Sequence, residues 1–241
     1  MFNCLGSQKN SYSGYYLGVI MSYVEVCKVS KRIGPEEVLS NVNFEVDLGS
    51  IVGLEGENGS GKTMAMRTVC GLVRPDTGTV SVDGKQLWRQ IDFPQSLGFL
   101  IEEPALLNSY SGLKNLELLA SIRNTVTKEE LKQAMNRVGL LPDNKKPCKT
   151  YSLGMKQRLG IALAIMEHPE LLVLDEPTNA LDEEGRAMLV NVLQEEKKRG
   201  AAILISSHDQ NFLSSICDMS YHMSFGKICK AQTNNVKGET R

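Results

Sequence analysis

The sequence predicts an α/β fold whose strand core is interrupted by a helical insertion. Short apolar runs alternate with segments of helical periodicity along most of the chain, a pattern typical of buried parallel strands connected by helices. Between Glu102 and Gly160 no strand signal occurs, which indicates the insertion. Two dipeptides with hairpin turn chemistry, Asp83-Gly84 and Gly226-Lys227, indicate antiparallel strands beside the core. In such a fold, ligands gather at the carboxyl ends of the parallel strands.

The individual elements follow from the spacing of apolar residues. Strands are expected where these residues alternate or run without interruption, at Tyr23–Val29, Val42–Leu48, Ile51–Glu55, Val80–Val82, Leu97–Ile101, Leu171–Leu174 and Ala201–Ser206. One helix is expected directly after Gly61. Further helices are expected at Leu113–Arg123, Lys128–Val138, Leu153–Met166, Glu183–Lys198 and Asp209–Cys217.

Length and composition favour one large domain with a short N-terminal extension. The 241 residues, of which 41% are hydrophobic and 23% charged, lie in the range of soluble globular domains. Residues 1–20 are rich in Ser, Tyr, Gly and Asn, and we interpret them as a disordered extension or as an upstream start before Met21. The remaining domain, 21–241, is expected to have a core at 21–101 and 161–241 and a helical subdomain at 102–160.

Charge and hydropathy limit the partners of the chain. The formal net charge is -1 and there is no polybasic run, so a nucleic acid would lack the basic surface that it requires. No apolar stretch approaches the roughly 20 residues needed to span a bilayer. Any membrane contact is therefore expected to pass through another chain.

A glycine-rich run between an expected strand and an expected helix carries the strongest functional signal. It consists of Gly56, Glu57, Asn58, Gly59, Ser60, Gly61, Lys62 and Thr63, which satisfies the phosphate-loop pattern GxxxxGK[ST]. Its glycines let backbone N–H groups converge on phosphate oxygens, and the helix start adds its positive dipole end. Lys62 would supply a charge to the β and γ phosphates, and the Thr63 hydroxyl would reach Mg²⁺.

Two adjacent carboxylates follow the apolar strand Leu171–Leu174. Asp175 is expected to hold Mg²⁺ through its water shell, and Glu176 is expected to orient or deprotonate the water that attacks the γ-phosphate. For an isolated strand of this kind, a simple turn before Pro177 would be the better interpretation. The phosphate loop upstream favours the catalytic one.

A third motif, Tyr151–Met155, precedes an apolar helix and places Ser152 at its N-cap position. A serine-capped helix start can bind an anion. Alone, the segment would be no more than a capped core helix, but its place between the phosphate loop and the strand that precedes Asp175 makes it specific.

Together these motifs resemble the nucleotide-binding subunits of ATP-binding cassette (ABC) transporters, with Gly56–Thr63 as Walker A and Leu171–Asp175 as Walker B. The resemblance covers roughly residues 23 to 230. It implies a P-loop NTPase fold with a RecA-like core, an antiparallel β subdomain and an inserted helical subdomain.

The family signature is usually LSGGQ, which this chain matches at Ser152 and Gly154. Tyr151, Leu153 and Met155 depart from it, which weakens a role for those side chains but not for the start of the helix. The resemblance implies that Ser152 and Gly154 contact the γ-phosphate of ATP bound to the opposite subunit of a head-to-tail dimer.

Two further residues acquire roles from the resemblance. Asp182 ends a segment that looks like the family's D-loop, which implies a place at the dimer interface beside the nucleotide. His208 follows the last apolar strand of the core and looks like the switch histidine that contacts the γ-phosphate. A lone histidine is more often structural, and we keep that interpretation for His168 and His222.

One departure from the family is acidic. At the place of the family's Q-loop glutamine, after the strand Leu97–Ile101, this chain has Glu102, and a slip of one residue onto Glu103 is the alternative alignment. A carboxylate can approach Mg²⁺ or its waters but cannot donate a hydrogen bond as glutamine does, so Glu102 is expected to act in catalysis and metal binding. Together with the sequence SLGMKQR, Glu102 resembles the E-loop ATPases of bacitracin export and lantibiotic immunity.

A second departure concerns the nucleotide base. The family usually stacks adenine on an aromatic residue, and the corresponding position here is Ile33. An aliphatic contact still covers the base but loses a stacking contribution of about 1 kcal/mol. Tyr23 or a tyrosine of the N-terminal extension could substitute.

These observations favour the ATP-binding and ATP-hydrolysing subunit of a bacterial ABC transporter, resembling exporters of peptide antibiotics, lantibiotics or multiple drugs. The resemblance implies ATP and Mg²⁺ as cofactors, a dimer with itself or with a second ABC ATPase, and permease chains as partners at the cytoplasmic face of the cell membrane. Two alternatives stay open: a soluble ABC ATPase that assembles or remodels a protein complex, and a P-loop enzyme that phosphorylates a small molecule. The signature and the Asp182 segment argue against the second.

Overall fold

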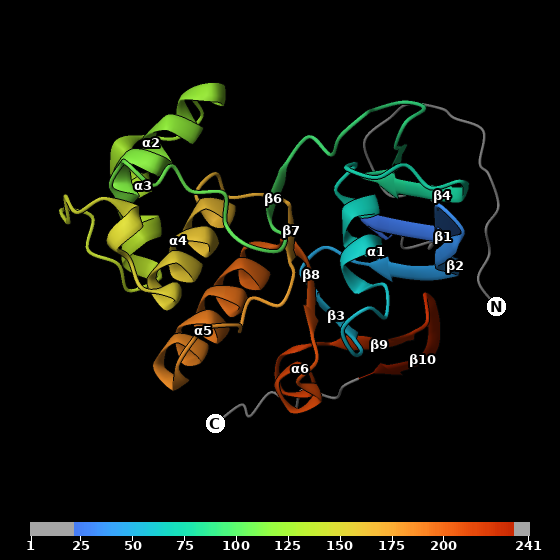
Figure 1. The fold of residues 1–241 in the computed structure, drawn as a ribbon. Helices are drawn as coiled ribbons and strands as arrows, with labels where there is room; N and C mark the ends of the chain where they lie inside the picture. The colour runs from blue at the N-terminus through green and yellow to red at the C-terminus, as the bar shows by residue number, and fades with distance from the viewer. Residues whose placement is uncertain (1–21, 234–241) are drawn as a thin grey trace.

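Two β-sheets form the frame of the protein, of which the computed structural model describes residues 22–233 (Figure 1). The larger sheet has the strand order β10-β9-β3-β8-β7-β6. Its strands are β3 (Ile51–Glu55), β6 (Leu97–Leu100), β7 (Leu171–Leu174), β8 (Ala202–Ser207), β9 (Met219–Ser224) and β10 (Lys227–Thr233). Neighbouring strands are parallel except for β9 and β10, which form an antiparallel hairpin.

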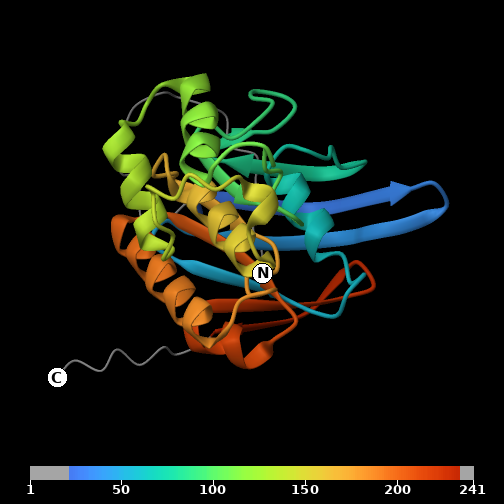
Figure 2. The same ribbon diagram turned by 60° about the vertical axis from the view of Figure 1, so that its left-hand side comes forward.

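The second sheet is antiparallel and has the order β2-β1-β4-β5. It contains β1 (Val24–Ile33), β2 (Glu36–Val46), β4 (Thr77–Val82) and β5 (Lys85–Gln86). Asp83 and Gly84, with φ angles of 51° and 67°, form the two-residue turn between β4 and β5, as their sequence predicts. In Figure 2 the β1–β2 ribbon extends beyond the rest of the molecule.

Apolar side chains fill two separate cores on the two faces of the larger sheet. In β8, Ala202 and Leu204 pack towards the antiparallel sheet and helix α1 (Lys62–Val69), whereas Ile203 and Ile205 pack towards the other helices. Successive side chains of a strand point to opposite faces, so a strand buried on both faces requires a continuous apolar run. This requirement explains why the buried strands are recognisable in the sequence.

Three helices occupy the chain between β6 and β7. They are α2 (Gly112–Arg123), α3 (Lys128–Arg137) and α4 (Leu153–Ile165), and a 3₁₀ turn at Cys148–Thr150 precedes α4. Ser111, Thr127 and Ser152 cap these helices with their side-chain oxygens, which places each start where the sequence pattern indicates it. The remaining helices are α5 (Glu183–Arg199) and α6 (Gln210–Ile216), which lie below the first three in Figure 1.

The predicted α/β fold with a helical stretch after β6 is confirmed, but several strand bounds differ. β2 begins at Glu36, six residues before the predicted start, and β4 begins at Thr77, three residues before it. β1 continues to Ile33, beyond the predicted end at Val29. The prediction ended too early because the outer half of the strand is polar and irregular, with Lys28 at a φ of 51° and three shifts of register against β2. The β9–β10 turn consists of Phe225 and Gly226, one residue earlier than predicted, because Ser224 pairs with Lys227.

Two expectations concern the ends of the chain and the membrane. The extension predicted for residues 1–20 lies outside the described residues. Across residues 22–233, no helix combines the length and the apolar character needed to cross a membrane.

Candidate active site

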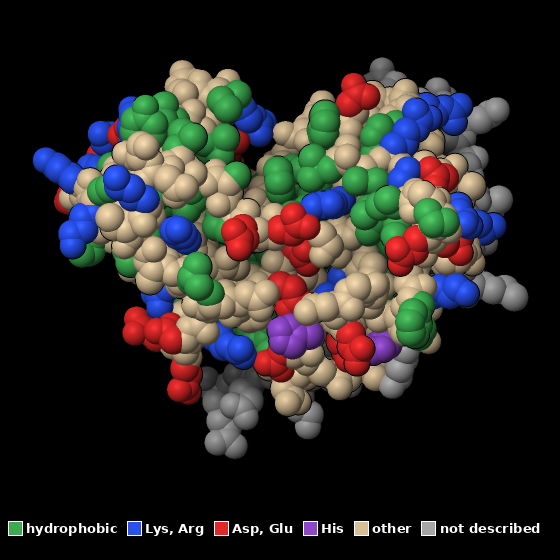
Figure 3. All heavy atoms as spheres, in the orientation of Figure 1, with side chains coloured by type: hydrophobic (Ala, Val, Ile, Leu, Met, Phe, Trp, Pro, Cys, Tyr) green, Lys and Arg blue, Asp and Glu red, His purple; other side chains and the backbone are tan. Residues whose placement is uncertain are grey.

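Four parallel strands end at one edge of the larger sheet and deliver the predicted site residues there. The loop Gly56–Thr63 follows β3, Glu102 comes shortly after β6, Asp175 directly follows β7, and His208 directly follows β8. Glu55 at the end of β3 lies opposite Ser207 at the end of β8, so these two ends are level. Figure 3 shows acidic side chains gathered along the middle of this face, with a histidine beside them.

The loop Gly56–Thr63 runs from β3 to the start of α1 in a conformation that requires glycine. Gly56, Gly59 and Gly61 have φ angles of 154°, 79° and 106°, and a Cβ at Gly56 would lie 2.4 Å from the carbonyl oxygen of Met223. No side chain caps α1 at Gly61. The N–H groups of the first helical turn therefore have no side-chain acceptor, which is the arrangement of an anion site.

The Lys62 side chain folds back over this loop. Its ammonium group donates to the carbonyl oxygens of Gly56 at 2.6 Å and Glu57 at 3.1 Å. Its Nζ also lies 3.3 Å from Oε1 of Glu176, an ion pair that lacks hydrogen-bond geometry. Only 5% of the Lys62 side chain is exposed, so a full positive charge is held inside the loop.

Asp175 is a buried carboxylate with both oxygens bonded. The Thr63 hydroxyl donates to Oδ2 at 2.6 Å, and the Ser206 hydroxyl donates to Oδ1. Thr63 begins α1 and Ser206 lies in β8, so the carboxylate at the end of β7 joins the phosphate loop to the neighbouring strand. Because both donors are short side chains on regular elements, the position of Asp175 is well defined.

Glu176 and His208 form the second polar pair of the site. Nδ1 of His208 lies 2.9 Å from Oε2 of Glu176, and the Glu176 N–H donates to the Ser206 hydroxyl at 2.9 Å. Glu176 has a φ of 45°, which is rare for a residue with a side chain and is often found at functional sites. This backbone turns the carboxylate towards Lys62 on one side and His208 on the other.

The donor atoms at this edge suit a phosphate ester accompanied by Mg²⁺. Hydroxyl and carboxylate oxygens, as in Thr63 and Asp175, are ligands that Mg²⁺ prefers. Among residues 22–233 no group of three or more His, Cys, Asp or Glu side chains could hold a metal alone; Mg²⁺ usually binds through one or two carboxylates together with phosphate oxygens and water. Within the same range, the Ser60 hydroxyl is buried in the loop without a hydrogen-bond partner, which is consistent with an acceptor oxygen supplied by a ligand.

Glu102 borders the site without touching the Asp175 cluster. Its φ is 60°, and its carboxylate pairs with Arg67 of α1 at 2.8 Å. The residue nevertheless lines a groove of about 510 Å³ that also reaches Thr63, Asp175 and Glu176. The structure thus places Glu102 in the same groove as the predicted Mg²⁺ ligands, but the direct ionic partner of its carboxylate is Arg67.

Ser152, Gly154 and Asp182 lie in a separate groove. This groove has a volume of about 450 Å³, and no residue of the phosphate loop lines it. Asp182 caps α5 by accepting from the N–H of Gly185 at 2.8 Å, and it also accepts from Arg158 at 3.2 Å. The Gly185 N–H and the Arg158 guanidinium hold the pKa of Asp182 below its ordinary value. Within one chain, neither Ser152 nor Gly154 shares a groove with a residue of the phosphate loop.

Ile33 and Tyr23 are the two described residues that were considered for contact with the nucleotide base, and only Ile33 is accessible to solvent. Ile33 ends β1 and is 53% exposed. Tyr23 is buried in the core between the two sheets, and its hydroxyl donates to Glu170 at 2.9 Å. The expectation that Tyr23 could replace the family's aromatic residue is therefore wrong, because its ring is enclosed by the fold. The tyrosines of the extension lie outside the described residues.

Sequence reasoning missed two residues that complete the site. Ser206 binds both Asp175 and the backbone of Glu176, and the signal that indicates it is a polar residue at the buried end of an apolar strand. Arg67 neutralises Glu102, but it lies far from Glu102 in the sequence and belongs to a helix whose local pattern gives no sign of the contact.

Comparison with known proteins gives one consistent result. The family model described as ABC transporter matches residues 39–179. The chain is 43% identical over 205 residues to the uncharacterized ABC transporter ATP-binding protein YybJ of Bacillus subtilis (strain 168), covering 85% of this chain and 94% of that protein. It is 41% identical over 213 residues to the bacitracin transport ATP-binding protein BcrA of Enterococcus faecalis, covering 87% of this chain and 69% of that protein.

A solved structure shares the fold. The ATP-binding cassette MJ0796, determined as a dimer in a post-hydrolysis state with ADP and Pi, superposes with a TM-score of 0.79 at 21% identity and covers 89% of this chain and 99% of that chain. The family model and the two relatives indicate the same family. The phosphate loop between β3 and α1 and the carboxylates after β7 agree with it. The chain belongs to the ABC transporter family and is an ABC-type ATPase domain.

Proposed function

We propose that the chain binds MgATP at the carboxyl edge of the larger sheet and that its hydrolysis drives a transporter. The observation that carries this proposal is the contact of Thr63 with Asp175, made directly beside Lys62 and the Glu176–His208 pair. A phosphate-binding loop, a metal-binding carboxylate and a base for water thus lie within one cluster. Hydrolysis of a phosphoanhydride requires these three functions together.

The loop would bind the phosphates and the adjoining oxygens would hold the metal. The N–H groups of Gly56–Thr63 and the start of α1 would contact the phosphate oxygens, and the Lys62 ammonium would exchange its loop carbonyls for the β and γ phosphates. Thr63 and Asp175 would hold Mg²⁺, directly or through water. When bound, Mg²⁺ neutralises the charge that develops on the phosphates.

Glu176 is placed to act on the attacking water. Its Oε2 would accept a proton from the water as the oxygen attacks the γ-phosphorus, while the bond to the β-phosphate oxygen breaks and ADP leaves. The hydrogen bond from His208 keeps the carboxylate in position and presents a second polar group to the γ-phosphate. Glu102 would tune the rate through Arg67 and the groove that it shares with Thr63.

The active form is proposed to be a head-to-tail dimer, with a second copy of the chain or with another ABC ATPase. Ser152, Gly154 and Asp182 support this proposal, since they line a groove that no residue of the phosphate loop lines. A capped helix start is suited to a γ-phosphate presented by a partner. The division into a core at 21–101 and 161–241 and a helical subdomain at 102–160 belongs to the same proposal.

The transported material is proposed to be a peptide antibiotic, a lantibiotic or a related drug, moved outward through permease chains at the cytoplasmic face of the cell membrane. Support comes from the relative named for bacitracin transport and from the acidic residue at the position of the Q-loop glutamine. Neither the relatives nor residues 22–233 offer a feature that favours a soluble, non-transport ABC ATPase.

Two measurements test the proposed function. Mg²⁺-dependent ATP hydrolysis should be abolished by Lys62→Ala and by Glu176→Gln, and Glu176→Gln should accumulate ATP-bound dimers. Purification from detergent-solubilised native membranes should recover integral-membrane chains. Recovery of soluble partners alone would contradict the transporter function, and a Glu176→Gln variant that binds ATP as a monomer and still turns it over would contradict the ATPase mechanism.

A further inference from the structure

The turn between β9 and β10 carries a residue that its backbone does not favour. Ser224 pairs with Lys227, so the turn consists of Phe225 and Gly226, with φ angles of 46° and 72°. Two-residue turns with both φ angles positive favour Asn-Gly, because a side chain is strained in this region. A phenylalanine that breaks this local preference indicates a function for its side chain.

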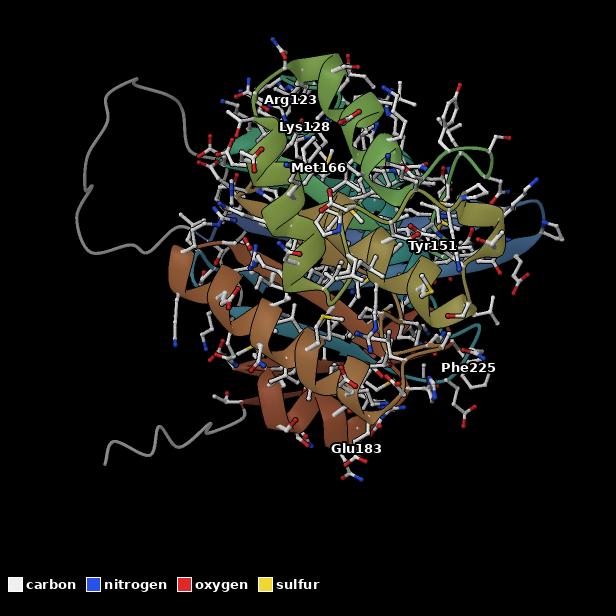
Figure 4. The ribbon with its side chains drawn as sticks, turned by 90° about the vertical axis from the view of Figure 1, so that its left-hand side faces the viewer. Arg123, Lys128, Tyr151, Met166, Glu183 and Phe225 are labelled. Atoms are coloured by element: carbon white, nitrogen blue, oxygen red, sulfur yellow. The ribbon has the colours of Figure 1, made fainter. Side chains whose placement is uncertain are left out.

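The Phe225 ring gains no compensation from packing. It is 91% exposed, more than any other large apolar side chain among residues 22–233. In Figure 4 the Phe225 label lies at the edge of the molecule, away from the helices that carry Arg123 and Glu183. An exposed ring at this turn stabilises neither the turn nor the core, so the packing of the chain does not explain the choice of phenylalanine.

The backbone of this turn is fixed against the phosphate loop. The Gly226 N–H donates to the Ser60 carbonyl at 2.9 Å, and the Gly226 carbonyl accepts from the Ser40 N–H at 2.8 Å. Gly226 Cα lies 3.3 Å from the place where a Cβ on Gly61 would stand. The turn and the loop lie side by side in Figure 2. Gly226 is therefore bound to the loop that would hold the phosphates, and Phe225 is the residue immediately before Gly226 in the chain.

The strand order decides which end of the nucleotide lies nearest to Phe225. β3 has β8 and β7 on one side and β9 on the other. Glu176 and His208, which would act on the γ-phosphate, follow β7 and β8, so the γ end points to that side. The nucleoside must then leave the loop on the side of β9, where Phe225 is held.

Ile33 approaches from the same side. It faces Glu36 across the β1–β2 hairpin, and Val38, two residues further along, has its carbonyl oxygen 2.7 Å from where a Cβ on Gly226 would stand. The exposed aliphatic side chain of Ile33 and the exposed ring of Phe225 thus flank one region beside the phosphate loop.

We propose that Phe225 packs against the base of the nucleotide and supplies the aromatic contact that Ile33 does not. This inference rests on the proposed function, since it takes the loop to be the site of the nucleotide phosphates. An aromatic ring placed on a purine stabilises the complex by stacking and by burial of apolar surface. Phe225 is a specificity-determining residue of the ATP site, contributed from outside the loop itself.

The test compares ADP with pyrophosphate, each in the presence of Mg²⁺, by calorimetric titration of the full chain. ADP contains the base but lacks the γ-phosphate that would recruit a second chain, and pyrophosphate contains neither. The variant Phe225→Asn should fold at least as well as the natural chain, because Asn suits this turn. It should weaken ADP binding about three- to tenfold and leave pyrophosphate binding unchanged.

Two further variants serve as controls. Phe225→Tyr keeps the ring and should bind ADP as the natural chain does. Ile122→Asn removes another exposed apolar side chain, 76% exposed on α2, and should change neither affinity.

Three results would overturn the inference. The first is unchanged ADP affinity in Phe225→Asn. The second is an equal loss for ADP and pyrophosphate, which would indicate a distorted loop. The third is unchanged ADP affinity together with a loss of ATP-dependent dimers, which would assign the ring to the partner chain. If the natural chain bound neither ADP nor pyrophosphate, the proposed function itself would fail, and that outcome is distinct from the other three.

Discussion

The pairing of Lys62 with Glu176 makes the nucleotide-free protein sensitive to a conservative substitution. Lys62 is almost wholly buried, and its charge is balanced by one carboxylate and two loop carbonyls. The Glu176 side chain is 15% exposed, so solvent screens this pair only weakly. Glu176→Gln keeps the shape of the side chain and removes the negative charge. We therefore expect the variant to be less stable than the natural chain when no nucleotide is bound.

The magnitude follows from what Lys62 retains. Removing one partner of a fully buried ion pair costs about 3–5 kcal/mol when the other charge is left alone. Lys62 keeps the carbonyl oxygens of Gly56 and Glu57, so its charge is not left alone and most of that cost is avoided. The net loss should therefore be about 1–2 kcal/mol. For a domain of this length that corresponds to a fall of about 2–8 °C in Tm.

Thermal unfolding with and without ADP measures this effect. ADP places phosphate oxygens beside Lys62 and restores the missing negative charge, so it should raise the Tm of Glu176→Gln more than that of the natural chain. Using ADP avoids a contribution from ATP-dependent dimers. Glu57→Gln, which changes an exposed carboxylate of the same loop, is the matched control and should leave Tm nearly unchanged. A Tm for Glu176→Gln equal to or above that of the natural chain would refute the reasoning.

Three further substitutions test the neighbouring contacts. Thr63→Val keeps the shape but removes the hydroxyl that donates to Asp175, so the Mg²⁺ concentration for half-maximal ATP hydrolysis should rise about tenfold or more; an unchanged Mg²⁺ titration would contradict this. Ser206→Ala removes a fully buried donor to the same carboxylate and should lower the free energy of unfolding in urea by about 1.5–3 kcal/mol, whereas a loss below about 0.5 kcal/mol would be inconsistent with it. Glu102→Gln breaks a half-exposed pair with Arg67, so stability should change by less than about 1 kcal/mol while kcat for ATP changes more than KM; a change confined to KM would show that Glu102 acts in binding.

The buried parts of the fold could be predicted from the sequence because burial imposes a pattern. β7 and β8 are apolar on both faces, and such runs are recognisable without knowledge of their neighbours. The helix starts at Ser111, Thr127 and Ser152 carry their own capping residues. The outer half of β1 is different, since its residues are polar and its pairing with β2 shifts in register. Nothing local marks such a segment as a strand.

In the candidate active site, too, some residues could be predicted from the sequence and others could not. Asp175, Glu176 and His208 could be predicted because the first two follow β7 in succession and the third follows β8, and parallel strands bring such positions to one edge. The partner of Glu102 could not be predicted, because Arg67 lies on α1, far from Glu102 in the sequence, and only the folded chain brings the two together. The hairpin at Phe225 was predicted from Gly226, but its position beside the phosphate loop depends on strand order, which the local sequence does not encode.

Mixing two inactive variants tests most directly the claim that each active site is built from two chains. Lys62→Ala disables the phosphate loop. Ser152→Asp keeps a residue suited to capping α4 but places a negative charge where the partner's γ-phosphate would lie, and Ser152→Asn, which caps without charge, controls for the substitution itself.

Each variant alone should be inactive in ATP hydrolysis. In an equimolar mixture, half of the dimers would contain both variants and one site of each would be intact, so about a quarter of the natural activity should return. A mixture that stays inactive, although gel filtration shows mixed dimers in the presence of ATP, or a Ser152→Asp chain that remains fully active alone, would contradict the account.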